Sequence, residues 1–303
     1  MRVLVTGSSG FLGRHVAVRL GRDGDFDVTG FDLEPSRDTT FRSVQGDIDD
    51  LDSIRRASRG TDVVVHLGGV GDVDLASARP GLAARANVVG TTHVAMAAAE
   101  TGARIVYAST WEVYGTPISD PIDETHPCDP ANIYAATKLG GEHVLRALER
   151  SDGVPVTILR LGTAYGTGMR PNSVFRRFTD AARAGLPLAV QGSGQQWRQF
   201  THASDIARAV GLALPSPAGG ATFNIAADEC VTVLRLAELV STRYGTTVAF
   251  GPERPGDPPS ARISSAAAAR TLGWRAEVEF ESGLTDVLDD VDARHERAAG
   301  ART

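Results

Sequence analysis

The first twenty residues, MRVLVTGSSGFLGRHVAVRL, contain the pattern that decides the fold. Residues 3–6 are a short apolar, β-branched run, which is typical of a buried strand. Apolar residues then recur at a spacing near 3.6 over residues 11–20, which predicts a helix. The loop between them has the glycine spacing GxxGxxG, formed by Gly7, Gly10 and Gly13. A strand that turns through glycines into a helix presents backbone amides to an anion, so the loop predicts a site for a dinucleotide pyrophosphate.

The same alternation of strand and helix continues to residue 161. The predicted strands cover residues 28–31, 63–67, 105–109 and 156–161, and the predicted helices cover residues 51–57, 83–100 and 131–149. These strands are continuous apolar runs, as expected when helices cover both faces of a parallel sheet. The sequence therefore predicts an α/β fold built on a doubly wound parallel sheet.

The pattern loosens after about residue 165. Stretches rich in glycine and proline at residues 165–171, 215–220 and 251–259 separate short helices and strands. We therefore predict a dinucleotide-binding domain over residues 1–165, which includes the helix of residues 131–149. A smaller, partly interleaved substrate-binding lobe is predicted over residues 166–303.

Charge and cysteine content exclude several classes of function. The chain of 303 residues carries a net charge of -6, so we expect no nucleic-acid partner. Cys128 and Cys230 lie far apart and no two histidines stand three or four positions apart, so we expect no metal site and no disulfide framework. The chain begins with a strand rather than an apolar leader, so we expect a cytoplasmic protein without membrane contact.

An acidic residue, Asp32, follows the strand predicted at residues 28–31. A carboxylate at this position binds both ribose hydroxyls of the adenosine half of NAD and repels the 2′-phosphate of NADP. We therefore predict NAD as the cofactor. Asp47 and Ile48, in the turn after the next strand, are predicted to contact the edge of the adenine.

Tyr134 and Lys138 lie four positions apart in a predicted helix and therefore share one helix face. An ammonium close to a phenol favours the phenolate, which predicts a Tyr134 pKa lowered from about 10 toward the working pH. Such a phenol can accept and donate a proton. The strand at residues 105–109 delivers Ser109 and Thr110 to the carboxyl edge of the sheet, where ligands bind in open α/β folds.

The order of these motifs resembles a known family. The segments that carry the resemblance are the TGxxGxxG loop, Asp32, the Gly46-Asp47-Ile48 turn, NVVGT at residues 87–91, STWEVYG at residues 109–115, the YxxxK pair, RQFTHASD at residues 198–205, FNIA at residues 223–226, RPGD at residues 254–257 and LGW at residues 272–274. Together they are similar to the extended short-chain dehydrogenase/reductase family of nucleotide-sugar epimerases and dehydratases. The resemblance covers nearly the whole chain and implies a Rossmann fold, NAD and a nucleotide-diphosphate sugar as substrate.

The resemblance implies chemistry on a sugar hydroxyl. Tyr134 would take the proton of the hydroxyl, Lys138 would hold the nicotinamide ribose, and Thr110 would contact both the hydroxyl and Tyr134. Glu112 is a further catalytic candidate. The implied cofactor contacts are Gly7, Gly10, Phe11, Leu12, Gly13, Asp32, Asp47, Ile48, Leu67, Gly68, Asn87, Tyr134 and Lys138.

The resemblance also implies which residues hold the substrate, and it implies a homodimer. The substrate residues are Ser109, Thr110, Arg198, Arg254 and Asp257. The two arginines are expected on the diphosphate, because a guanidinium makes bidentate contacts with phosphate. Gly162 and Thr163 stand where the family often has a diphosphate-binding asparagine, which departs from its pattern.

Several activities are compatible with this set of residues. An NAD-dependent 4-epimerase passes through a transient 4-keto sugar, whereas a dehydratase or decarboxylase shares the oxidation and then uses Glu112. A 4-keto reductase and a dinucleotide-sensing binding protein would also fit the same fold and motifs. In the family's 4,6-dehydratases the triplet beginning at Thr110 resembles T-D-E, and here Trp111 replaces the acid. An indole cannot deliver a proton, so we favour the epimerase.

Overall fold

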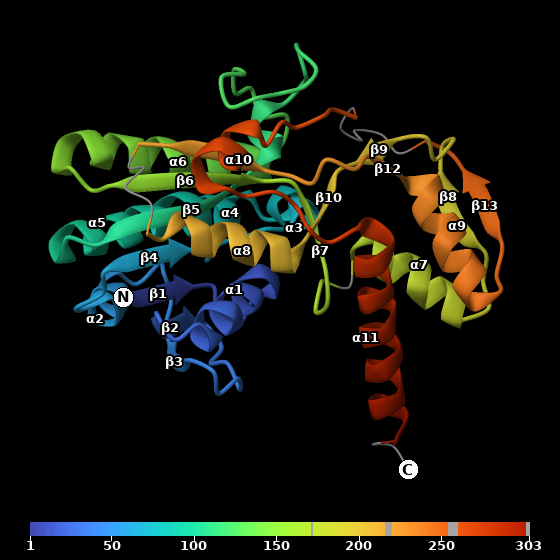
Figure 1. Ribbon diagram of the computed structural model, residues 1–303, viewed down its shortest axis with the longest axis horizontal. Coiled ribbons are helices and arrows are strands. Elements are labelled where there is room, and N and C mark those ends of the chain that lie inside the picture. The colour runs from blue at the N-terminus through green and yellow to red at the C-terminus, as the bar shows by residue number, and fades with distance from the viewer. Residues whose placement is uncertain (171, 216–219, 254–259, 301–303) are drawn as a thin grey trace.

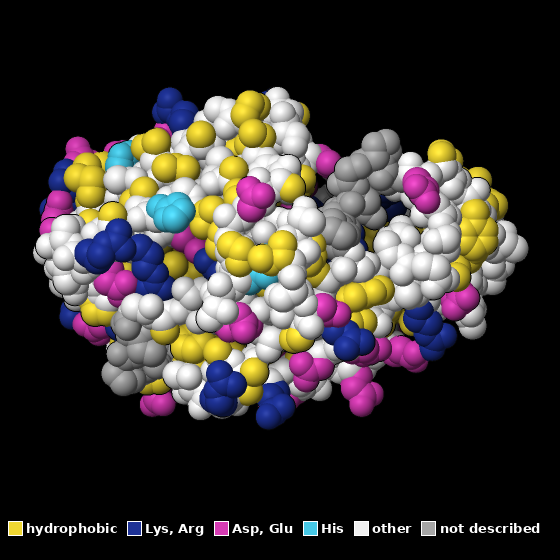
Figure 2. Space-filling model, turned by 90° about the horizontal axis from the view of Figure 1, so that it is seen from above, with side chains coloured by type: hydrophobic (Ala, Val, Ile, Leu, Met, Phe, Trp, Pro, Cys, Tyr) yellow, Lys and Arg dark blue, Asp and Glu magenta, His cyan; other side chains and the backbone are white. Residues whose placement is uncertain are grey.

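The computed structural model describes residues 1–170, 172–215, 220–253 and 260–300 (Figure 1). A seven-stranded parallel sheet carries helices on both faces, and a smaller lobe lies to one side of it. The α/β fold with a doubly wound parallel sheet is therefore confirmed. On the face seen in Figure 2, acidic and basic side chains are interspersed over both the body and the lobe.

The main sheet positions the functional residues through its strand order. Its strands are β1 (Arg2–Thr6), β2 (Asp27–Asp32), β3 (Arg42–Gln45), β4 (Val63–His66), β5 (Arg104–Thr110), β6 (Val156–Leu161) and β11 (Thr222–Ile225). They are arranged in the order β3, β2, β1, β4, β5, β6, β11. Val3 of β1 pairs with Val28 on one side and with Val63 on the other. The direction of winding reverses between β1 and β4, which opens a crevice at their carboxyl ends.

The two faces of the sheet are covered by different helices. Val3 and Val5 belong to a core with α1 (Phe11–Arg22), α8 (Ala203–Ala213) and α10 (Ala266–Leu272). Leu4 belongs to a second core with α2 (Leu51–Ser58), α5 (Thr91–Thr101) and α6 (Ile133–Asp152). Because alternate residues of a strand point to opposite faces, the continuous apolar run of β1 serves both cores.

The single helix predicted at residues 83–100 is wrong in its bounds and its form. The structure has α3 (Val73–Ala78), α4 (Pro80–Ala84), the π-helix η1 (Arg85–Gly90) and α5. In η1, Gly90 packs so closely on Ile48 that an added Cβ would lie 2.8 Å from that side chain. A wide π turn is often found near functional sites, and an alanine-rich pattern does not reveal one.

The smaller lobe has its own apolar core. It contains α7 (Val174–Arg183), β8 (Leu188–Gln191), α9 (Val233–Tyr244), β13 (Val248–Gly251) and α11 (Phe280–Gly300). The short strands β7 (Thr163–Tyr165), β9 (Trp197–Arg198), β10 (Phe200–His202) and β12 (Val231–Thr232) connect it to the body. The Tyr165 and Phe175 rings stack at the centre, 5.3 Å apart, and Phe200 and Phe280 pack around them.

The chain passes more than once between the body and the lobe. After the first lobe segments it returns through α8, which packs on α1, and then through β11, which pairs with β6. Residues on both sides of position 165 thus build the main sheet. The predicted division into two domains at residue 165 stays a prediction.

Asp205 holds the return segment in place and supports a stability prediction. Its carboxylate is 1% exposed and accepts the backbone N–H groups of Glu277 and Val278 at 3.1 and 3.0 Å. We expect Asp205→Ala to lower the free energy of unfolding by about 3 kcal/mol, because two part-buried amides lose their buried acceptor. Urea denaturation measures the loss. The control, Asp289→Ala at an exposed ion pair with Arg243, should cost less than about 1 kcal/mol; equal losses would contradict the role given to Asp205.

Candidate active site

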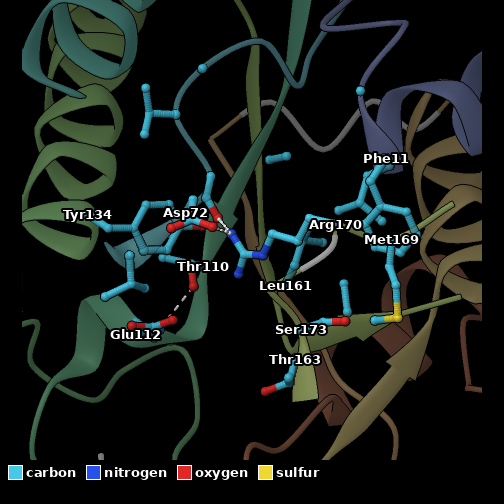
Figure 3. A pocket seen from close by; sticks show the side chains of 18 of the residues that line it. Phe11, Asp72, Thr110, Glu112, Tyr134, Leu161, Thr163, Met169, Arg170 and Ser173 are labelled. Carbon is cyan, nitrogen blue, oxygen red and sulfur yellow. Dashed lines mark hydrogen bonds and ion pairs between the residues drawn. The ribbon is translucent and has the colours of Figure 1, made fainter. Parts of the chain in front are cut away.

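A cavity of about 600 Å³ lies at the carboxyl edge of the main sheet, where the lobe faces the body (Figure 3). Eleven of the predicted site residues line it: Gly7, Gly10, Phe11, Leu12, Gly13, Leu67, Ser109, Thr110, Glu112, Tyr134 and Lys138. Residues scattered between positions 7 and 138 of the sequence are thus brought to one place by the parallel strands. Arg254 and Asp257, predicted to contact the substrate, lie outside the described residues.

The glycine loop is built for close backbone contacts. Gly7 has φ of +72°, and an added Cβ would lie 2.7 Å from the backbone nitrogen of Gly68. A Cβ on Gly13 would lie 1.9 Å from the carbonyl oxygen of Gly7. Gly10 is the N-cap of α1 and carries no side chain that could cap the helix amides. The first turn of α1 therefore presents its N–H groups and the positive end of its dipole to an anion, which fits the pyrophosphate of a dinucleotide.

Asp32 ends β2 beside this loop. Its carboxylate accepts the N–H of Ser9 at 2.9 Å and the N–H of Glu34 at 3.2 Å, so its orientation is set by the backbone around it. Each carboxylate oxygen keeps a second lone pair for a ribose hydroxyl. Asp32 does not line the main cavity itself, and its contact with the adenosine ribose stays a prediction.

Three further predicted cofactor contacts use their polar groups within the protein. Asp47 accepts the N–H of Asp49 at 2.9 Å, and the Ile48 carbonyl accepts from a ring nitrogen of His93. The N–H of Gly68 donates to Thr6 at 3.1 Å. Direct cofactor contacts of Asp47, Ile48 and Gly68 therefore stay predictions.

Asn87 has a structural role that sequence reasoning missed. It is 1% exposed and does not line the cavity. Its side chain accepts the N–H of Val70, donates to the carbonyl of Val70 and donates to the Thr137 hydroxyl, at 2.8 to 3.0 Å. Asn87 thereby ties the loop after β4 to helix α6, which carries Tyr134 and Lys138.

Thr110, Glu112 and Tyr134 meet at the inner end of the cavity (Figure 3). Thr110 is the last residue of β5, and its hydroxyl oxygen accepts the N–H of Glu112 at 3.3 Å, which starts the short 3₁₀ helix η2 (Trp111–Tyr114). Against the larger effect of burial, Thr110 lowers the pKa of Tyr134, so the two side chains interact. This is the arrangement needed for a phenol and a hydroxyl to share one substrate group.

The sequence predicted a lowered pKa for Tyr134, and this prediction is wrong. Burial raises the pKa of Tyr134 to about 12, and the nearby Glu112 carboxylate adds to that shift. Burial also lowers the pKa of Lys138 to about 7, against an opposing effect of Glu142. The Lys138 ammonium lies over the Tyr107 ring, 4.1 Å from its centroid. The Lys138 ammonium therefore makes a cation–π contact with the Tyr107 ring, and it is not among the groups that shift the Tyr134 pKa.

Glu112 is a part-buried carboxyl group whose pKa lies above its ordinary value. Burial raises its pKa, while a hydrogen bond from the Asn132 side chain at 2.8 Å and the charges of Arg170 and Arg198 work in the opposite direction. Such a carboxyl group keeps its proton to a higher pH than an ordinary glutamate does.

Ser109 lines the cavity but its hydroxyl is engaged inside the protein, so its contact with the substrate stays a prediction. Its hydroxyl donates to the carboxylate of Glu142, which also receives two hydrogen bonds from Arg160. Neither Glu142 nor Arg160 was predicted, although a glutamate one turn after Lys138 on an inward helix face was a signal in the sequence.

A second missed feature, Arg170, reaches into the cavity from the segment before α7 (Figure 3). It forms an ion pair with Asp72 at 2.9 Å and donates to the Gly71 carbonyl at 2.7 Å. Its charge acts on both Tyr134 and Glu112. Arg170 and Asp72 are far apart in the sequence and no local pattern connects them.

Arg198 lies beside the main cavity rather than in it. It lines a small adjoining space together with Trp111, Gly162 and Thr163, and those three residues also line the main cavity. The predicted diphosphate contact of Arg198 is therefore close to the site. Within the described part of the chain, no group of three or more acidic, histidine or cysteine side chains could hold a metal ion. No described helix is long and apolar enough to span a membrane.

Comparison with known proteins places this site in a family. The sequence profile of the NAD dependent epimerase/dehydratase family matches residues 3–226. The chain belongs to this family. Its relative dTDP-glucose 4,6-dehydratase of Streptomyces niveus is 31% identical, over 95% of this chain and 92% of that protein.

Solved structures agree with that assignment. The UDP-glucose 4-epimerase of Thermotoga maritima with UDP-glucose is 26% identical and has a TM-score of 0.90, over 97% of this chain and 99% of that chain. MoeE5 in complex with UDP-glucuronic acid and NAD is 30% identical and has a TM-score of 0.89, over 97% and 100%. The predictions of the family, of the Rossmann fold and of NAD as cofactor are confirmed. The relatives include both 4-epimerases and 4,6-dehydratases of nucleotide sugars.

Cofactor choice gives a direct test of Asp32. We expect Asp32→Ala to weaken NAD binding about tenfold through lost ribose hydrogen bonds, and to bring the dissociation constants of NAD and NADP close together as the repulsion of the 2′-phosphate disappears. Calorimetry with both dinucleotides measures the change. Asp27→Ala, at the opposite end of the same strand, is the control and should leave NAD preference intact. Unchanged discrimination in Asp32→Ala would show that another residue selects NAD.

Proposed function

We propose that the protein is an NAD-dependent nucleotide-sugar 4-epimerase that acts through a transient 4-keto sugar. The observation that carries the proposal is the position of Trp111, between Thr110 and Glu112. Trp111 is 8% exposed, lines the cavity and packs with Val113 and Ile263. A 4,6-elimination needs an acid for the leaving C6 hydroxyl as well as a base at C5, and the indole supplies no such acid at this position.

The chain's own residues account for the proton transfers. In its phenolate form Tyr134 accepts the proton of the C4 hydroxyl, and Thr110, which lines the same cavity, contacts that hydroxyl. Lys138 supplies positive charge and hydrogen-bond donors at the base of the cavity. NAD, held by the glycine loop and Asp32, would supply the hydride acceptor for C4 and the hydride donor for the return step. Tyr134 then gives its proton back to the C4 oxygen, so inversion at C4 leaves no net oxidation.

The substrate end of the site is proposed to hold a diphosphate. Arg198 and the backbone of Gly162 and Thr163 adjoin the main cavity on the lobe side. Position 162 has to be glycine for packing, because an added Cβ would lie 2.8 Å from the Thr201 hydroxyl oxygen and 3.0 Å from the Ala226 Cβ. Arg254 and Asp257 complete this proposal from outside the described residues.

A second candidate is an eliminating enzyme, either a dehydratase or a decarboxylase. The raised pKa of Glu112, beside Thr110 in the cavity, favours it because such a carboxyl group can serve as the second acid or base. No specific feature favours a 4-keto reductase. A dinucleotide sensor has no need of Thr110, Tyr134 and Lys138 in one cavity, which argues against that class.

Reaction in deuterated water separates the two candidates. The purified protein is incubated with NAD and a panel of UDP- and dTDP-sugars, and the products are examined by mass spectrometry and NMR. Epimerisation should give the C4 epimer without deuterium at C4 or C5, because the hydride returns from the cofactor. Deuterium at C5, a 4-keto-6-deoxy product or released carbon dioxide would contradict the epimerase proposal and favour an eliminating enzyme. The homodimer and the cytoplasmic location stay predictions, and light scattering tests the first.

A further inference from the structure

Glu142 is a buried carboxylate on the catalytic helix that has no part in the proton transfers described above. It lies one turn after Lys138 in α6 and is 4% exposed. Its carboxylate accepts the Ser109 hydroxyl and two N–H groups of Arg160, at 3.1 and 2.7 Å for the arginine. Ser109 and Arg160 are themselves paired across β5 and β6. The Glu142 carboxylate, with three donors around it, therefore holds helix α6 against strands β5 and β6.

The partners of Glu142 also contact the segment that carries the catalytic groups. Ser109 directly precedes Thr110 at the end of β5. The Arg160 guanidinium lies over the Tyr114 ring, 4.7 Å from its centroid, and Tyr114 ends the short helix η2 that contains Glu112. The Tyr114 hydroxyl in turn donates to Asn224 of β11 at 2.7 Å. Both ends of the segment from Ser109 to Tyr114 are therefore held by the Glu142 and Arg160 pair.

The charge of Lys138 depends on the same carboxylate. Lys138 is the only lysine in the chain and is 6% exposed. The groups that face it are His66 of β4, Tyr107 of β5, and Tyr134 and Glu142 of its own helix. Burial lowers the pKa of His66 to about 3 and raises the pKa of Tyr107, so both are neutral near pH 7.

The His66 ring is locked as a neutral group by its partners. The Thr91 hydroxyl donates to the Asn87 carbonyl at 2.7 Å and so accepts from the ring at Nε2, while Thr6 lies 2.7 Å from Nδ1. His66 therefore offers no negative charge to Lys138. Tyr134 is also protonated at neutral pH in the free protein. Against the lowering caused by burial, the negative charge of Glu142 therefore raises the pKa of Lys138.

We propose that Glu142 is a positioning residue: its carboxylate keeps the Lys138 ammonium charged and holds the segment of Thr110 and Glu112 against helix α6. Loss of the carboxylate charge makes the ammonium less stable, so Lys138 becomes a neutral amine at a lower pH than before. A neutral amine has one donor fewer for the cofactor ribose and no charge. The inference depends on the proposed reaction only in its activity measurement.

The single lysine allows its ionisation to be measured directly. Protein grown with ε-¹³C-lysine should give one side-chain signal, whose shift against pH reports the Lys138 pKa in the full chain, with NAD and without it. In Glu142→Gln the midpoint should fall by about one to three pH units. Glu142→Asp keeps the charge and should recover most of that shift. Ser109→Ala removes one hydrogen bond but no charge and should leave the midpoint in place.

A double variant guards against simple misfolding. Glu142→Gln leaves the Arg160 guanidinium buried without its partner, which can destabilise the chain on its own. Glu142→Gln with Arg160→Met removes both charges, and its Lys138 midpoint should remain below that of the wild type. A wild-type midpoint in either folded variant would overturn the proposal, because Glu142 would then serve Arg160 alone.

Activity supplies the second readout. Using the nucleotide sugar that the panel identifies, kcat at pH 7 should fall at least tenfold in Glu142→Gln, and the pH at which kcat changes should move with the Lys138 midpoint. A lowered kcat with an unshifted pH profile would reduce Glu142 to a structural residue. If the Lys138 midpoint shifts but no sugar in the panel reacts, the proposed function fails while the positioning role of Glu142 stands.

Discussion

Replacement of Tyr134 by phenylalanine is expected to lower kcat by about 10²- to 10⁴-fold, the usual contribution of a positioned acid or base. Tyr134 and Thr110 both line the cavity, and no other phenol of the described residues lines it. The ring of phenylalanine fills the same space, so the packing of α6 should be preserved. NAD should bind with a dissociation constant within about threefold of the wild type.

Two measurements test this prediction, one for each step. Single-turnover absorbance at the wavelength of reduced nicotinamide follows the oxidation step, and calorimetry follows cofactor binding. Tyr244→Phe is the matched control, because Tyr244 bonds Asp292 in the lobe, away from the cavity, and should keep full activity. If Tyr134→Phe retained more than about a tenth of wild-type kcat, Tyr134 would lose its role as the acid and base.

Gly13→Ala is expected to abolish NAD binding at concentrations that saturate the wild type. An added Cβ would lie 1.9 Å from the carbonyl oxygen of Gly7 and 3.0 Å from the Cα of Ser8. Both are backbone atoms of the loop, so relief requires α1 to move away from it. The helix N-terminus then no longer faces the pyrophosphate, which should raise the NAD dissociation constant at least about 100-fold, or about 2.8 kcal/mol.

The same substitution should also destabilise the fold. Overpacking of this kind costs about 1 to 3 kcal/mol, which thermal unfolding without cofactor will measure. Gly24→Ala is the control, because a Cβ there meets nothing within 4 Å. It should leave NAD affinity unchanged. Normal NAD affinity in Gly13→Ala would mean that the glycine loop is not the pyrophosphate site.

Much of the cofactor half of the site followed from sequence because its determinants are local. The spacing of Gly7, Gly10 and Gly13 directly after an apolar strand reflects steric contacts around one loop, where an added Cβ would lie 1.9 to 3.2 Å from backbone atoms. Tyr134 and Lys138 were placed on one face by helix geometry alone. The parallel sheet then brought them to Thr110, because the carboxyl ends of such strands share an edge.

By itself, then, the sequence determined the doubly wound sheet, the glycine loop, and the Thr110, Tyr134 and Lys138 set, since each depends on spacing within one or two adjacent elements. Tertiary structure alone decided the pairing of β11 with β6, the reach of Arg170 to Asp72, and the bonds of Glu142 to Ser109 and Arg160. It also decided the pKa of Tyr134, which burial raises to about 12 although the sequence places an ammonium nearby. The reason is that burial and charge partners depend on segments far apart in the chain, whose distances no local pattern specifies.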